Sequence, residues 1–61
     1  MPLTEDFYLG QLLYSAVKEN DKTKRNQIIE SARSLAQFLP DTVVNEIKKM
    51  VRDQLRDEAN G

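Results

Sequence analysis

The chain has 61 residues, of which 39% are hydrophobic and 31% charged, and its formal net charge is −1. It contains no cysteine and no histidine. This excludes disulfides and removes the common zinc ligands, the usual catalytic base and the best nucleophile. A single domain of this size, residues 1–61, buries only about 60% of its unfolded surface, so self-association or a partner protein is the remaining source of stability.

The sequence also argues against a membrane protein, a cofactor enzyme and a small-molecule binder. No apolar run is long enough to span a bilayer, and the first residues lack the basic and apolar regions of a signal peptide. No glycine loop of the phosphate-binding kind occurs, and so small a chain has little room for a concave pocket. We therefore expect a cytoplasmic, non-enzymatic protein with no cofactor, no bound metal and no catalytic residues.

The first predicted helix covers residues 5–18. Thr4 is a suitable N-cap because its hydroxyl can accept from the free N–H groups of the first turn, and two acidic residues follow it. Leu3 before the cap and Tyr8 in the helix are spaced to form a hydrophobic staple.

The second predicted helix covers residues 23–38, with Asp21 or Thr23 as its cap. Pro40 disfavours helical geometry at the residue before it and so ends the segment. The apolar residues recur at spacings of three and four, which places them on one helix face. They are Ile28, Ile29, Ala32, Leu35, Ala36 and Leu39.

The third predicted helix covers residues 41–57, with Asp41 or Thr42 as its cap, and residues 57–61 are expected to fray. Its apolar stripe consists of Val43, Val44, Ile47, Met50, Val51 and Leu55. Three amphipathic helices with short connections predict an all-α, antiparallel three-helix arrangement. The competing layout opens out one helix and pairs it with a second copy of the chain.

The first helix is apolar around most of its circumference, which indicates neighbours on more than one side. Besides its core-facing stripe, it carries a separate line made of Phe7, Gly10, Tyr14 and Val17. Gly10 costs roughly 1 kcal/mol in a helix interior relative to Ala, so a packing reason for it is expected. We predict that this line, with Leu3 and Tyr8 at its edge, is a protein interface whose notch lies at Gly10.

Two interpretations of this line remain open. In one, the other two helices of the same chain cover it. In the other, which we favour, Phe7 and Tyr14 face a second subunit or a different protein, because exposed aromatic rings dominate interface energetics. A symmetric homodimer is the preferred form, since most soluble oligomers are of this kind. On this hypothesis Tyr14→Glu abolishes association and leaves helicity intact.

A basic strip on the third helix offers an alternative function, the binding of nucleic acid. Three acidic residues on the adjacent arc weaken this interpretation, and no aromatic residue is interleaved to stack on bases. The bases near the start of the second helix, at 22–25, are interpreted as solvated. The strip consists of Lys48, Lys49, Arg52 and Arg56.

The favoured prediction is a homodimeric helical module that binds and regulates a protein target. A small nucleic-acid-binding accessory protein is the second hypothesis, and a structural subunit of a larger assembly is the third.

Overall fold

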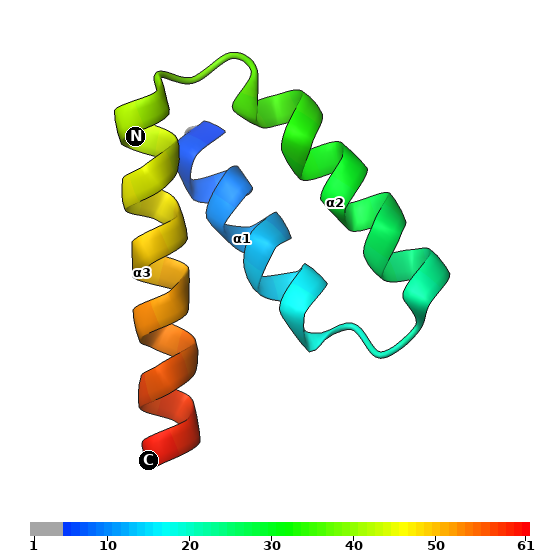
Figure 1. The fold of residues 1–61 in the computed structure, drawn as a ribbon, viewed down its shortest axis with the longest axis vertical. Coiled ribbons are helices and arrows are strands. Elements are labelled where there is room, and N and C mark those ends of the chain that lie inside the picture. Colours follow the sequence, from blue (N-terminus) through cyan, green and yellow to red (C-terminus); the bar gives the residue numbers. More distant parts are fainter. Residues whose placement is uncertain (1–4) are drawn as a thin grey trace.

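The computed structural model describes residues 5–61, and within that range the chain consists of three α-helices and no strand. Helix α1 spans Glu5–Lys18, α2 spans Lys22–Ala36 and α3 spans Asp41–Asn60. The all-α, three-helix prediction is confirmed, and the bounds of the first helix agree with the predicted ones. In Figure 1, α1 runs downward, α2 returns upward and α3 runs downward again.

Helix α2 ends two residues before its predicted end. The N–H groups of Phe38 and Leu39 donate to the carbonyls three residues earlier, on Leu35 and Ala36, at 3.0 and 3.1 Å. Such bonds tighten the chain into a turn at a helix end. Pro40 restricts the backbone just beyond, so the segment leaves helical geometry earlier than its apolar pattern indicates.

The predicted caps have different outcomes. The Asp21 side chain accepts from the N–H groups of Thr23 at 2.9 Å and Lys24 at 3.3 Å, which confirms it as the cap of α2. The prediction for α3 is wrong, because Pro40 takes the cap position and no side chain bonds there. Pro40 has the extended ψ of a cap residue, so Asp41 falls at the first helical position. The predicted cap and staple at residues 3 and 4 lie outside the described residues.

The expected fraying of the C-terminal residues is also wrong, because α3 remains helical to Asn60. Sequence alone places Glu58 on a solvated end, whereas the structure ties it to two side chains of α1. Glu58 therefore connects the last turns of α3 to Tyr14, which lies 44 residues earlier in the chain.

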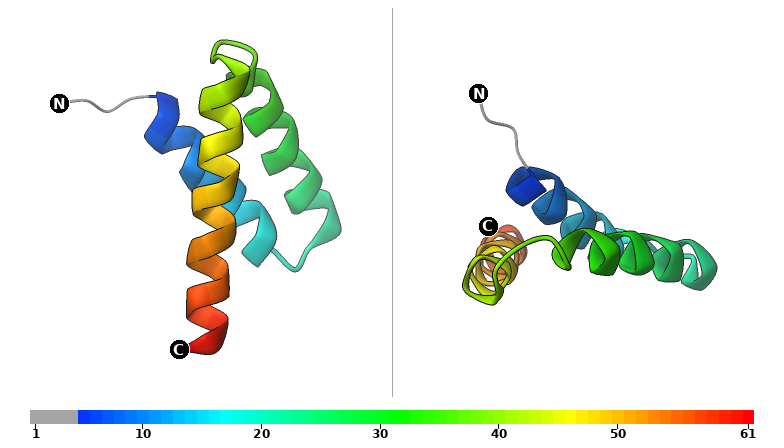
Figure 2. Two further views of the ribbon diagram at one scale, coloured as in Figure 1. Left: turned by 60° about the vertical axis from the view of Figure 1, so that its left-hand side comes forward. Right: turned by 90° about the horizontal axis from the view of Figure 1, so that it is seen from above.

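Helix α1 is the central element of the fold. It packs against both α2 and α3, whereas α2 and α3 barely touch each other. The left view of Figure 2 shows α2 and α3 diverging below the loop that joins them, and the right view shows α1 lying on the same side of both. The arrangement is therefore an open three-helix layout, in which the central helix keeps two partly uncovered sides.

The core is small and draws on all three helices. Leu9 at its centre is the most enclosed side chain, with 1% of its surface exposed. The other buried residues are Ala16, Ala32, Ile47 and Val51. Since only five of residues 5–61 are buried, much of the apolar surface predicted for the core lies at its edges.

Candidate protein-interaction surface

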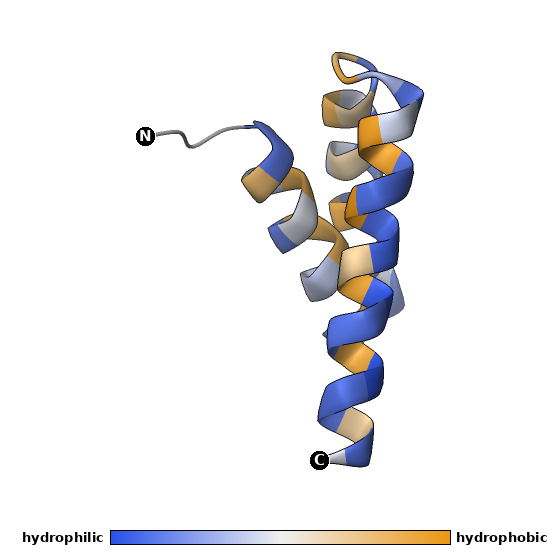
Figure 3. Cartoon of the chain, turned by 90° about the vertical axis from the view of Figure 1, so that its left-hand side faces the viewer, coloured by the Kyte–Doolittle hydropathy of each residue, from blue (hydrophilic) through white to orange (hydrophobic). Residues whose placement is uncertain are grey.

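Three of the predicted interface residues line one groove between α1 and α3. Phe7, Gly10 and Tyr14 form its α1 wall, and the groove encloses about 760 Å³ open to solvent. Figure 3 shows the two helices separating toward their N-terminal ends, with hydrophobic bands on both. The remaining lining residues are Asp6, Gln11, Thr42, Val43, Glu46, Ile47, Met50, Val51 and Gln54. We call this surface the α1–α3 groove.

Gly10 forms a recess in the wall of this groove. A Cβ atom built on it would lie 3.7 Å from Cγ2 of Ile47, which is ordinary van der Waals contact. Helix α3 therefore does not require glycine at this position. The helix-propensity cost of Gly10 has no explanation in the packing of a single chain.

Two large apolar side chains project at the edges of the same groove. Phe7 has 64% of its surface exposed and Met50 has 67%. The helical projection correctly directs Phe7 away from the core. Met50 belongs to the apolar stripe predicted for the third helix, but its side chain is not part of the buried core. It lies about 80° around the helix from the direction of Ile47 and Val51, a displacement that the 100° step per residue already implies.

Tyr14 lies closer to the chain's own core than the sequence indicates. It is half-buried and packs against the core cluster, so the expectation that it lies outside the intramolecular core is wrong. Its hydroxyl donates to both carboxylate oxygens of Glu58, at 2.8 and 2.6 Å. The Lys18 Nζ lies 3.1 Å from Glu58 Oε1 and 5.5 Å from the centre of the Tyr14 ring. These three side chains join α1 to the end of α3.

The contacts among Tyr14, Lys18 and Glu58 shift the pKa values of all three side chains. The hydrogen bonds from Tyr14 and Lys18 stabilise the ionised carboxylate and lower the pKa of Glu58. The same hydrogen bond to Glu58 raises the pKa of Tyr14, because its proton is held by an anion. Contact with Glu58 also raises the pKa of Lys18. At neutral pH all three groups are in the states that favour their contact.

Two further predicted interface residues, Tyr8 and Val17, are not brought into the α1–α3 groove. Val17 is 62% exposed but lines a different groove, and Tyr8 is exposed without lining the α1–α3 groove. Leu3 lies outside the described residues. The contiguous surface is thus formed by the first two turns of α1, by Tyr14 and by the part of α3 from Thr42 to Gln54.

A second groove opens on another side of α1, where α2 and α3 diverge, and encloses about 440 Å³. Two members of the predicted basic strip, Lys48 and Arg52, line it together with Arg25 of α2. Its other lining residues are Leu13, Ala16, Val17, Ile29, Val51 and Leu55. We call it the basic groove.

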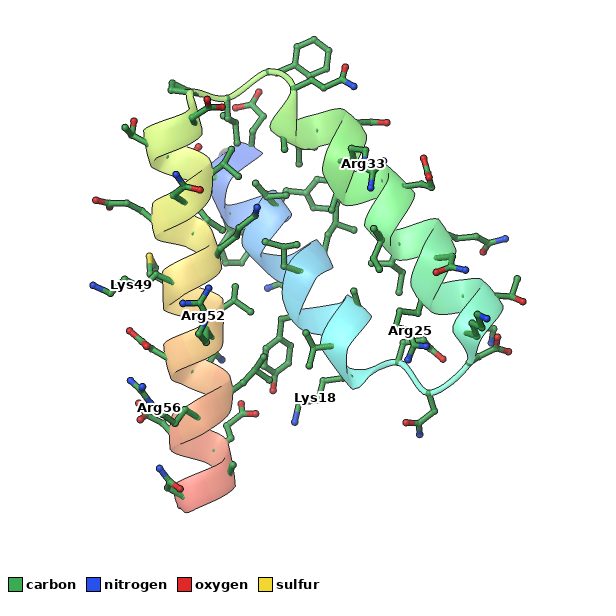
Figure 4. All side chains as sticks on the ribbon, in the orientation of Figure 1. Lys18, Arg25, Arg33, Lys49, Arg52 and Arg56 are labelled. Carbon is green, nitrogen blue, oxygen red and sulfur yellow. The ribbon has the colours of Figure 1, made fainter. Side chains whose placement is uncertain are left out.

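The basic strip is divided by the structure. Figure 4 shows Lys49 and Arg56 on the outer side of α3, away from α1. Arg56 is paired with Asp53, 2.9 Å away. Arg25, interpreted from sequence as merely solvated, is half-buried and belongs to the basic groove. No sequence signal links Arg25 to Lys48, because their proximity depends on how α1 separates the two outer helices.

Comparison with protein-family models, curated proteins and solved structures finds no match for this chain.

Two further findings concern the described residues 5–61. None of the three helices combines the length and apolar character needed to cross a bilayer. No group of three or more acidic, histidine or cysteine side chains is placed to hold a metal ion in this range.

Proposed function

We propose that this chain is a non-enzymatic protein-interaction module that forms a homodimer through the α1–α3 groove. The observation that carries the proposal is the pairing, on one face, of projecting apolar side chains with a recess at Gly10. Phe7 of one copy enters the recess of the other, and the symmetric contact forms on the opposite side. A face that carries both complementary shapes suits a two-fold interface, in which one patch meets itself.

The energetics of the single chain support association. Within the described part of the chain only five residues are buried, and two side chains as large as Phe7 and Met50 remain about two-thirds exposed. Burying such a side chain contributes roughly 1.5–3 kcal/mol, and a symmetric dimer buries the Phe7 and Met50 side chains of both copies. Association would thus add the apolar burial that so small a core lacks.

The proposed mode of action is stoichiometric binding that regulates a protein target. The sequence has no histidine or cysteine, the side chains that most often serve as general base and nucleophile. A cysteine-free chain also suits the reducing cytoplasm, where disulfides do not contribute to stability. The self-association interface is the part of this proposal that the following experiment tests.

Sedimentation velocity of the wild type and of charged variants tests the dimer. We expect Phe7→Glu, and separately Met50→Glu, to weaken self-association at least about 100-fold, since each places two carboxylates in an apolar contact. Phe38→Glu is the matched control, because Phe38 is 80% exposed and lines neither groove. The control should dimerise like the wild type and all variants should keep their helical circular dichroism.

Two outcomes would overturn the proposal. A wild-type chain that stays monomeric at about 100 µM has no homodimer of functional strength. A Phe38→Glu variant that dissociates as readily as Phe7→Glu would place the interface elsewhere.

A further inference from the structure

We propose that the basic groove is a second docking site, which receives an amphipathic helix of another protein whose apolar face is flanked by carboxylates. This site is separate from the proposed homodimer interface, because Val51 is the one described residue that lines both grooves. The floor, the charged rim and the walls of the basic groove each favour this occupant.

The floor of the basic groove is apolar and accessible. Leu13 and Val17 of α1 lie between Ile29 of α2 and Leu55 of α3. Val17 is 62% exposed, and Ile29 is 39% exposed. The surface stays open because α2 and α3 diverge and leave this side of the central helix uncovered. An apolar strip bordered by charge is typical of a helix-binding groove.

The rim of the groove is entirely cationic among the described residues that line it. Arg25 stands on the α2 side, and Lys48 and Arg52 stand on the α3 side, with no carboxylate between them. Figure 4 shows Arg25 between α1 and α2 and Arg52 on the near side of α3. In the α1–α3 groove, in contrast, the charged residues among the described lining side chains are Asp6 and Glu46. The charged side chains of the two grooves therefore have opposite sign, although the net charge of the chain is only −1. The positive charge of the basic groove favours an acidic partner.

The walls favour a helical occupant over an extended one. The floor and both walls of the groove are helices, whose backbone N–H and C=O groups are bonded within each helix. An extended peptide on this floor would find no strand edge with which to pair its backbone, and unpaired buried backbone groups are costly. A helix satisfies its own backbone and presents only side chains. From Lys48 to Leu55 the α3 wall covers two turns, about 10 Å, which matches anchors spaced at i, i+3 or i+4, and i+7.

Nucleic acid fits the rim but not the floor. Phosphates would be attracted to Arg25, Lys48 and Arg52. The described lining residues include no aromatic side chain on which a base could stack. The apolar side chains of the floor would make no favourable contact with charged phosphates. The floor is the feature that distinguishes a protein helix from a nucleic acid as the occupant.

A designed probe tests the site directly. The probe is a labelled helical peptide of about 15 residues, with leucines at i, i+3, i+4 and i+7 and glutamates on both flanks. We expect wild-type protein to bind it in fluorescence anisotropy, and a peptide with lysines in place of the glutamates to bind at least about ten-fold more weakly. Peptide titration should shift the methyl resonances of Leu13, Ile29 and Leu55, and leave that of Met50 in place.

Matched variants assign the binding to the groove. Arg25→Gln combined with Arg52→Gln should weaken peptide binding about five-fold or more. Arg33→Gln combined with Lys49→Gln is the control, because it removes the same charge from the same two helices outside the basic groove. The control should change the affinity less than about two-fold. Phe7→Glu should leave peptide binding unchanged, so a failed homodimer and a failed docking site give different results.

Three outcomes would overturn this proposal. The first is an affinity for the acidic peptide that is no higher than for its lysine counterpart. The second is an equal loss in the control variant, which would mean that general surface charge is responsible. The third is tighter binding of a short double-stranded DNA than of the acidic peptide with the same dependence on Arg25 and Arg52, which would assign the rim to phosphates.

Discussion

A substitution at Gly10 should have opposite effects on the stability of the single chain and on the strength of the proposed dimer. A Cβ at this position would meet only Ile47 Cγ2, at 3.7 Å, so alanine fits the single chain without displacing a neighbour. Alanine is about 1 kcal/mol more favourable than glycine in a helix interior. We therefore predict that Gly10→Ala raises the free energy of unfolding by about that amount. Urea unfolding in the Phe7→Glu background measures it on a monomeric chain.

The same substitution should weaken the proposed dimer. The added methyl group fills the recess that receives Phe7 of the second copy, and sedimentation should show association about ten-fold weaker. If Gly10→Ala instead strengthened association in step with folding, the recess would have no part in the interface. The substitution therefore tests the recess itself, in addition to the apolar character of the face.

The Tyr14–Lys18–Glu58 cluster makes the end of α3 sensitive to pH. The pKa of Glu58 is lowered from 4.5 by its hydrogen bonds, so its contribution to stability is present above that value and is lost as the pH falls through the lower folded pKa. The pKa of Tyr14 is raised above 10.0, so its contribution is present below that pH and is lost at higher pH. The attachment is closed throughout the neutral range and opens at both extremes.

We predict that acidification from about pH 7 to about pH 3 releases the last turns of α3 before the rest of the chain unfolds. Backbone carbon chemical shifts of residues 57–60 should lose their helical values in a step that Glu58→Gln removes. A C-terminus that stays helical at pH 3 in the wild type would show that the cluster does not hold it. Because Tyr14 has this intramolecular role, Tyr14→Glu disturbs both the cluster and the groove, and Phe7 is the cleaner site for testing the interface.

At the scale of the elements, the sequence predicts which segments are helical but not how they share their surfaces. The spacing of apolar residues and the cap at Asp21 are local signals, and both hold in the structure. The extension of α3 to Asn60 was missed because it depends on Glu58 meeting Tyr14, a contact between distant positions. Pro40 shows a further limit, since its backbone geometry replaces the side-chain caps that the residues after it offer.

For the candidate surfaces, too, features carried by one helix were predicted and features that depend on contacts between helices were not. The line of Phe7, Gly10 and Tyr14 was found because a single helix carries it, and the structure places all three in one groove. Arg25 was missed because its surroundings come from other helices, whereas the 100° step per residue already turns Met50 away from the direction of Ile47 and Val51. A helical projection gives the direction of a side chain but not which neighbour stands there, and here α1, rather than α2, borders α3.

At the scale of the whole molecule, the opposite charges of the two grooves give opposite dependence on salt. In the proposed two-fold dimer the acidic rim of one α1–α3 groove faces the same rim of the other, and Asp6 and Glu46 of each copy repel those of its partner. Raising the salt from about 0.05 to about 0.3 M shortens the screening length to roughly 6 Å and weakens this repulsion. We predict that the dimer tightens about two-fold or more, whereas binding of the acidic peptide to the basic groove weakens.

Sedimentation equilibrium across this salt range measures the dimer, and Asp6→Asn combined with Glu46→Gln should abolish its salt dependence. A dimer that loosens with salt would contradict the two-fold arrangement. It would mean that the acidic rim of one copy meets the basic rim of the next, through Arg25, Lys48 and Arg52. Such a head-to-tail contact leaves one groove free at each end, so the chain would grow into longer assemblies with concentration, and the sedimenting species would not stop at two copies.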